Sequence, residues 1–232
     1  MWRAQVESLE KLGHPVLAID LPGHGARLDE RFSLASAAAA VHDGVRALVA
    51  ASSRGGQVTD EPRVVVVGLS LGAYVALHAV AKDPSRVGAV VAAGCCTSPS
   101  PVMLAGWSLL VRLIGALPDR GAALNQFMVD RTLPRQAALD VAEGGFALGV
   151  MADMLREMRG CDPRSDLARI AVPVWLVNGR LDHFRAQERA FARAGQDARL
   201  RIVPRAKHLV SLDAPVSFTR IVLETIDELE RR

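Results

Sequence analysis

The sequence predicts an α/β domain with a mostly parallel sheet, flanked by helices and interrupted by a helical insertion. Short, continuous runs of β-branched and other apolar residues alternate along the chain with longer segments of helical periodicity. Such runs are typical of strands that are buried on both faces of a parallel sheet. Between Thr97 and Ala171 the alternation stops and helical patterns follow one another, which indicates an insertion.

The elements can be predicted in chain order. An amphipathic helix opens the chain, and Gly13 ends its pattern. A second helix follows Ser33, a suitable N-cap, and residues 52–62 form a polar surface loop. A third helix runs from about Leu71 to Pro84. The sheet has about five strands, expected at 15–20, 63–68, 86–94, 173–179 and 199–204.

These elements predict three parts in the chain. Residues 1–96 form the first part of the core, residues 97–171 form a helical cap insertion, and residues 172–232 complete the core. With 232 residues, the chain is long enough for one sizeable hydrophobic core.

Charge and composition argue against several classes of function. The formal net charge is +3, but the basic residues are scattered among acidic ones, so we expect no nucleic-acid binding. The three cysteines lack metal-ligand spacing and favour a reducing, cytoplasmic compartment, and no metal or cofactor is expected. We expect no signal peptide and no membrane span, because charges interrupt the N-terminus and no apolar run of about 20 residues is present.

The segment from Gly68 to Gly72 reads G-x-S-x-G, directly between a predicted strand and a predicted helix. In this context the pattern indicates a nucleophile elbow, in which a sharp turn lifts the Ser70 hydroxyl above the sheet. We expect both glycines to be required because larger side chains would collide with the neighbouring strand and helix. The N–H of Leu71, at the start of the helix, would stabilise an oxyanion. The plainer interpretation is that Ser70 is a small residue in a tight turn.

A serine nucleophile requires a histidine base and an acid that orients it. Asp182 follows the predicted strand at 173–179, and Asp153 and Asp162 are its rivals. His208 follows the strand at 199–204. Its rival, His183, adjoins the acid and cannot easily turn back onto Ser70.

Four segments in succession resemble landmarks of the α/β-hydrolase superfamily: "AIDLPGHGAR", "VVVVGLSLGAYVALHAVAKDPSRVGAVVAAG", "DLARIAVPVWLVNGRLD" and "AKHLVSLDAPVSFTRIVLETI". The resemblance covers nearly the whole chain and implies the capped branch with a serine nucleophile. It assigns the nucleophile to Ser70, the acid to Asp182, the base to His208 and one oxyanion donor to the Leu71 N–H.

The resemblance also implies a cofactor-free hydrolase with a small apolar acyl substrate. That substrate is a carboxylic ester, a thioester, a lactone or an activated ketone with a cleavable C–C bond. Transferase, lyase and perhydrolase chemistry use the same residues. Apolar residues at helical spacing usually belong to a core, but we expect some of the insertion to contact substrate. The candidate substrate-binding residues are His24, Trp107, Met128 and Met151.

The sequence departs from the family pattern at its beginning. In the family, the second oxyanion donor comes from a His-Gly loop upstream of a tryptophan that resembles Trp2. The chain as written lacks this loop and the strands around it, which favours a true start further upstream. The alternative is a catalytically impaired or non-enzymatic binding protein, or a truncated fragment, on the same scaffold.

Overall fold

The computed structural model of the protein describes residues 1–52, 63–145 and 147–231. Beyond Ser52, the polar loop predicted at 52–62 lies outside the described residues. The chain forms two compact units. The first comprises Met1, Asp20–Ala37 and Ser98–Asp162, and the second comprises Trp2–Ile19, Ala38–Thr97 and Pro163–Arg232. The three-part division expected from the sequence stays a prediction.

The second unit contains a four-stranded sheet in the order β1-β2-β3-β4, and every neighbouring pair is parallel. The strands are Val64–Leu69 (β1), Val87–Ala93 (β2), Val174–Gly179 (β3) and Ala198–Val203 (β4). Each lies within one residue of a predicted strand, so the parallel α/β architecture is confirmed. Because all four strands run in the same direction, their carboxyl ends meet at one edge of the sheet.

Two expectations about the strands were wrong. Residues 15–20 form no strand, and β1 is half-buried rather than buried on both faces. Within the described part of the chain, β1 pairs with β2 alone, so β1 is an edge strand, which explains its partial exposure. Residues 15–20 pair with none of the four described strands. The described sheet therefore has four strands rather than about five.

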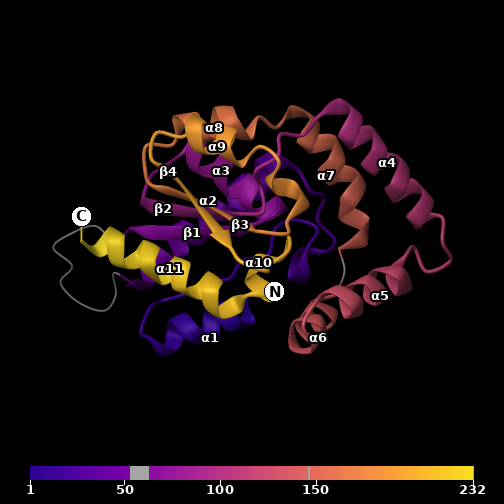
Figure 1. Ribbon diagram of the computed structural model, residues 1–232, viewed down its shortest axis with the longest axis horizontal. Helices are drawn as coiled ribbons and strands as arrows, with labels where there is room; N and C mark the ends of the chain where they lie inside the picture. Colours follow the sequence, from indigo (N-terminus) through magenta and orange to yellow (C-terminus); the bar gives the residue numbers. More distant parts are fainter. Residues whose placement is uncertain (53–62, 146, 232) are drawn as a thin grey trace. The chain divides into compact units, whose positions relative to one another are not determined.

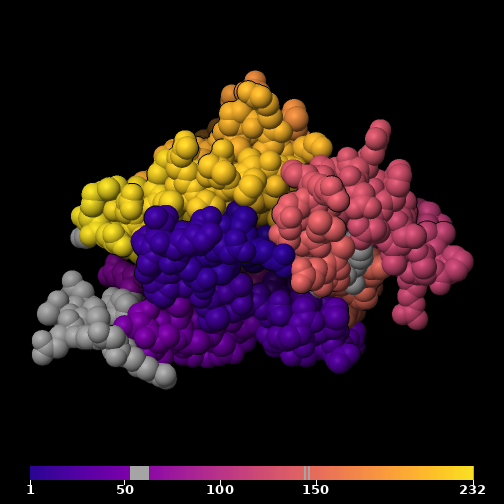
Figure 2. Space-filling view, turned by 90° about the horizontal axis from the view of Figure 1, so that it is seen from below, coloured from indigo at the N-terminus to yellow at the C-terminus, as the bar shows by residue number. Residues whose placement is uncertain are grey.

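Helices of the second unit lie on both faces of the sheet (Figure 1). One layer contains α3 (Leu71–Lys82), α8 (Pro163–Arg169) and α9 (Glu188–Ala194), which pack on one another or on the strands. The opposite layer contains α11 (Pro215–Glu230), which packs on β1 and β2, and α1 (Arg3–Lys11), which packs on α11. Figure 2 shows the first and last helices, indigo and yellow, side by side.

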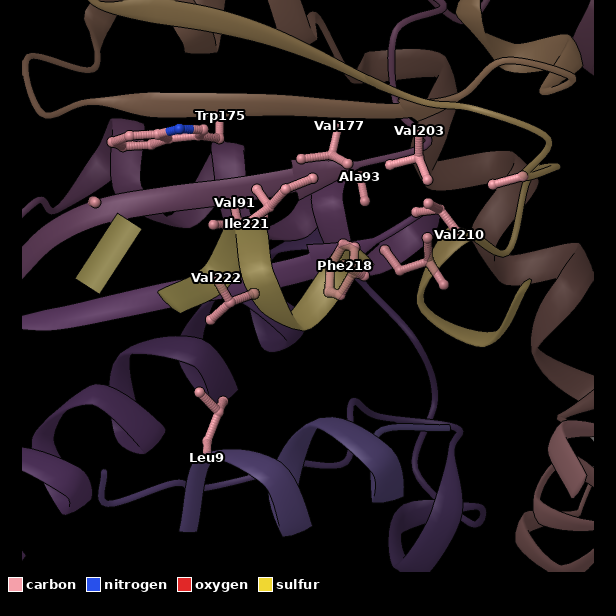
Figure 3. Packing of buried hydrophobic residues seen from close by; sticks show 13 residues of the cluster. Leu9, Val91, Ala93, Trp175, Val177, Val203, Val210, Phe218, Ile221 and Val222 are labelled. Carbon is pink, nitrogen blue, oxygen red and sulfur yellow. The ribbon is translucent and has the colours of Figure 1, made fainter. Parts of the chain in front are cut away.

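A cluster of buried hydrophobic residues lies between the sheet and α11 (Figure 3). Alternate residues of the central strands, such as Val91 on β2 and Trp175 on β3, point to the same face, as the two-residue period of a strand requires. They meet Phe218 of α11, whose ring centroid is 5.9 Å from that of Trp2. Burial of each large side chain contributes roughly 1.5–3 kcal/mol. This cluster fixes the sheet from one side.

Helix α2 (Leu34–Ser52) is the one described helix that is long and apolar enough to cross a membrane. This is weak evidence for a span, because core helices of soluble proteins satisfy the same test. Its first turn is capped as the sequence predicts: the Ser36 N–H donates a hydrogen bond of 3.0 Å to Ser33 Oγ.

The described part of the first unit is helical, as expected for the insertion. It contains α4 (Pro101–Gly115), α5 (Ala122–Thr132), α6 (Arg135–Gly144) and α7 (Met151–Glu157). Short 3-10 turns lie at Gly25–Arg27, Leu148–Val150 and Met158–Gly160, and a further one, His183–Arg185, belongs to the second unit. The remaining helix of the second unit is α10 (Val210–Asp213).

Contacts within the first unit join residues 20–37 to the insertion. Arg31 donates two hydrogen bonds to Asp153, of 3.3 and 2.9 Å. The Leu34 N–H, at the start of α2, donates to Glu157 Oε2 at 2.9 Å. Hydrogen bonds from Arg31 and Arg156 outweigh desolvation and lower the pKa of Asp153 to about 2. Residues far apart in the chain thus form one unit.

Candidate active site

The candidate nucleophile lies in a strained turn between β1 and α3. β1 ends at Leu69 and α3 begins at Leu71, so Ser70 alone connects them. The φ angle of Ser70 is 52°, in the left-handed region that residues with a Cβ rarely adopt. Backbone strain of this kind collects at functional sites when the surroundings hold it. Here the Ser70 N–H donates a 2.8 Å hydrogen bond to the Ala93 carbonyl on the neighbouring strand.

The two glycines of the turn have different roles. A Cβ on Gly68 would collide with the backbone of Gly72, so Gly68 permits the close approach of strand and helix. A Cβ on Gly72 would meet nothing within 4 Å in the described part of the chain. The expectation that Gly72 is also required by crowding was wrong. The crowded atom at Gly72 is its own carbonyl, which faces Gly68.

The structure brings together Ser70, His208 and Asp182. His208 Nε2 lies 2.9 Å from Ser70 Oγ, and His208 Nδ1 lies 3.1 and 3.2 Å from the two oxygens of Asp182. One tautomer satisfies all of these contacts: Nδ1–H donates to the carboxylate, and Nε2 accepts from the serine hydroxyl. A hydroxyl in this position can pass its proton to the imidazole.

Asp182 is held in the loop after β3. Its side chain is 0% exposed, and the Phe184 N–H donates a 2.8 Å hydrogen bond to Oδ1. Burial raises the pKa of this carboxyl. Hydrogen bonds from His208 and Phe184, together with the electrostatic effect of the neighbouring His208 and His183, outweigh that effect and leave the pKa of Asp182 below its ordinary value. Asp182 is therefore suited to remain an anion beside the imidazole.

His208 reaches Ser70 by crossing the carboxyl edge of the sheet. It follows β4, whereas Ser70 follows β1, three strand intervals or about 14 Å away. The crossing loop passes over the end of β3, where a Cβ on Gly179 would collide with the carbonyls of Ala206 and Lys207. At the end of β2, a Cβ on Gly94 would lie 3.1 Å from the His208 imidazole.

Gly94 and Gly179 are site residues that sequence reasoning missed. Each is the glycine immediately at the end of a buried strand, and Gly94 has a φ of 62°. That position was the available signal, because strand ends in a parallel sheet adjoin the site. Phe184 was also missed. Its ring centroid lies 4.8 Å from that of His208.

The rivals of the site residues occupy other places. His183 Nδ1 lies 4.0 Å from Asp182 Oδ1, and its side chain is 66% exposed. The contact with the Ser70 hydroxyl comes from His208. Asp153 and Asp162 both belong to the first unit, whereas Asp182 belongs to the second.

Other predicted site residues are distributed between the two units. Leu71 is the first residue of α3, so its N–H has no acceptor within the helix. His24, Trp107, Met128 and Met151 lie in the first unit, where Trp107 and Met128 are 37% and 50% exposed. Their role in substrate binding stays a prediction. Across the described residues, no group of three or more His, Cys, Asp or Glu side chains is placed to hold a metal ion.

Comparison with known proteins identifies the family. The sequence pattern described as "Alpha/beta hydrolase family" matches residues 1–220. The chain belongs to the α/β hydrolase family. Among curated proteins, none matches the sequence of this α/β hydrolase.

Several solved structures are similar in fold to this chain. An enol-lactonase from Burkholderia xenovorans has a TM-score of 0.74 at 20% identity, covering 97% of this chain and 85% of its own. An esterase from Thermogutta terrifontis has a TM-score of 0.73 at 20% identity, covering 98% and 85%. A hydrolase from Pseudomonas aeruginosa has a TM-score of 0.72 at 26% identity, covering 97% and 84%.

Proposed function

We propose that this α/β hydrolase is a serine hydrolase that cleaves a carboxylic ester or a related acyl substrate through an acyl-enzyme. The observation that carries the proposal is the unbroken hydrogen-bonded series from Ser70 Oγ through His208 to Asp182. A binding protein has no physical need for such a series. Nucleophilic catalysis by serine requires it.

In the proposed mechanism, Ser70 Oγ attacks the acyl carbonyl carbon while His208 Nε2 takes the hydroxyl proton. Asp182 orients the imidazole and stabilises the imidazolium. The carbonyl oxygen becomes an oxyanion that the Leu71 N–H stabilises at the N-terminus of α3. His208 returns the proton to the leaving group. Water, deprotonated by His208, then hydrolyses the acyl-enzyme and regenerates Ser70.

The proposed substrate class is small and apolar around its acyl group. Trp107 and Met128 support this class, because they are apolar side chains that remain exposed in the first unit. With His24 and Met151, they are the proposed substrate contacts. Thioesters, lactones and activated ketones present the same electrophilic carbon and belong to the class. We also propose a reducing, cytoplasmic location, which the three buried cysteines favour.

A fluorophosphonate probe tests the proposal, because it forms a covalent bond with an activated serine. We expect stoichiometric labelling of the wild-type protein at Ser70 and hydrolysis of short p-nitrophenyl esters. Ser70→Ala should abolish labelling and lower kcat at least ~10⁴-fold.

Ser8→Ala is the matched control. The Ser8 hydroxyl donates to the Ala4 carbonyl within α1, away from the candidate site, so this variant should label normally. Folded wild-type protein that neither labels nor hydrolyses any ester would overturn the proposal and favour the non-enzymatic binding protein instead.

A further inference from the structure

A second set of hydrogen bonds links the nucleophile helix to the loop that carries the acid. The hydroxyl of Tyr74, one helical turn after Ser70, donates to the Thr97 carbonyl at 2.6 Å. Thr97 Oγ1 donates to the Phe184 carbonyl at 2.8 Å. The Phe184 N–H in turn donates to Asp182 Oδ1 at 2.8 Å. The nucleophile and the acid are thus joined by two routes, one through His208 and one through Thr97.

Phe184 is the point where the second route meets the site. Its N–H bonds to the Asp182 carboxylate, its carbonyl accepts from Thr97, and its ring lies against the His208 imidazole, with 4.8 Å between centroids. A shift of Phe184 would therefore change both the hydrogen bond to Asp182 and the ring contact with His208.

Burial and a neighbouring backbone hydrogen bond surround the hydroxyl contact of Thr97. Tyr74 is 7% exposed, and Thr97 is half-buried. A neighbouring bond of 3.1 Å, from the Gln187 N–H to the Cys96 carbonyl, joins the same two segments. The side-chain bond of Thr97 adds a second attachment next to it. Two attachments fix both the position and the direction of the acid loop, whereas one leaves it free to pivot.

We propose that Thr97 is a positioning residue, whose hydroxyl holds the Phe184 peptide and thereby aligns Asp182 and His208 with Ser70. The inference that this alignment serves catalysis rests on the proposed hydrolase function. Thr97 does not touch the reacting atoms. Its loss should therefore affect the chemical step more than the binding of substrate.

Three variants test the role of the hydroxyl. Thr97→Val keeps the shape and removes the hydroxyl, and we expect kcat to fall about tenfold with KM nearly unchanged. Thr97→Ser restores the hydroxyl and should recover most of the lost kcat. Thr225→Val is the matched control, because the Thr225 hydroxyl is also buried and bonds to the Ile221 carbonyl within α11. It should leave kcat at the wild-type value.

Tyr74→Phe tests whether the route acts as a series. If Tyr74 acts through Thr97, the double variant Tyr74→Phe/Thr97→Val should have a kcat within about twofold of Thr97→Val alone. Multiplication of the two single effects would contradict the series.

A measurement that needs no substrate separates this inference from the proposed function. The His208 Nδ1 proton shared with Asp182 should give a far-downfield proton NMR resonance in the folded protein. Thr97→Val should shift or broaden it, while Thr97→Ser and Thr225→Val should leave it in place. An unchanged resonance and a wild-type kcat in Thr97→Val would overturn the inference. A resonance that responds to Thr97→Val in a protein that hydrolyses no ester would instead contradict the hydrolase function alone.

Discussion

At the scale of single residues, Asp182 combines a fully buried carboxylate with a lowered pKa. Burial alone would favour the neutral acid. The Phe184 N–H and the His208 imidazole reverse that preference by binding the charged form. The Asp182 carboxylate is therefore more stable in the folded state than in the unfolded chain, so the free energy of unfolding depends on pH.

Asp182→Asn should remove the contribution of Asp182 to the pH dependence of the unfolding free energy. A carboxyl whose pKa is lower in the folded state contributes stability above its unfolded pKa, near 3.8, and loses it as pH falls through the folded pKa. We therefore expect the difference in unfolding free energy between wild type and Asp182→Asn to shrink between about pH 5 and pH 2. Urea unfolding at several pH values in this range measures it. A difference that stays constant or grows on acidification would show that the carboxylate is not stabilised as an anion.

At the scale of elements, sequence patterns predicted the strands well because local composition encodes them. The apolar, valine-rich runs in β1, β2 and β3 can be recognised without knowledge of the neighbouring strands, and β4 carries a weaker signal of the same kind. Residues 15–20 carry the same local signal but form no strand. A strand also needs a partner strand, and a local sequence pattern does not show whether one is present. Ser70, Asp182 and His208 could be predicted in the same way, because each follows the end of a predicted strand. The close approach of a loop to Gly179 and the contacts of Thr97 could not be predicted, because they depend on how loops cross the sheet.

Glycine substitutions test the crossing of the loop over β3. Gly179→Ala should destabilise the protein by about 1–3 kcal/mol or more, because the new Cβ meets backbone carbonyls that cannot rotate away. It should also lower kcat by displacing the loop that carries His208. Thermal unfolding and ester hydrolysis measure the two effects.

Gly106→Ala is the matched control with the opposite expected sign. Gly106 lies inside α4, and a Cβ there meets nothing within 4 Å among the described residues. Alanine should stabilise the helix by about 0.5–1 kcal/mol. A Gly179→Ala protein that melts at or above the wild-type temperature would contradict the steric contact at Gly179.

At the scale of the whole molecule, the chain passes repeatedly between two compact units. Residues 20–37 belong with the insertion rather than with the sheet, a grouping that the strand-and-helix pattern of the sequence does not predict. The bonds responsible are specific: Arg31 to Asp153, and Glu157 to the first turn of α2. These pairs are separated by more than one hundred residues, so no local pattern could have indicated them.

Glu157→Ala should loosen the start of α2. The Leu34 N–H loses its acceptor at a helix N-terminus, a contact worth about 1 kcal/mol, so hydrogen exchange at the start of α2 should accelerate about fivefold. Glu224→Ala, at an exposed position of α11, should leave exchange there unchanged. Equal exchange rates in Glu157→Ala and wild type would mean that Glu157 does not cap α2 in solution.

The register between β2 and β3 has a consequence for how such a protein can evolve. Hydrogen bonds pair Val90 with Val174 and Ala93 with Val177, although the whole helical insertion separates these strands in the chain. The ladder therefore holds its alignment independently of the length and content of the inserted segment. We therefore expect Ser70, Asp182 and His208 to stay in register when this segment is exchanged for another.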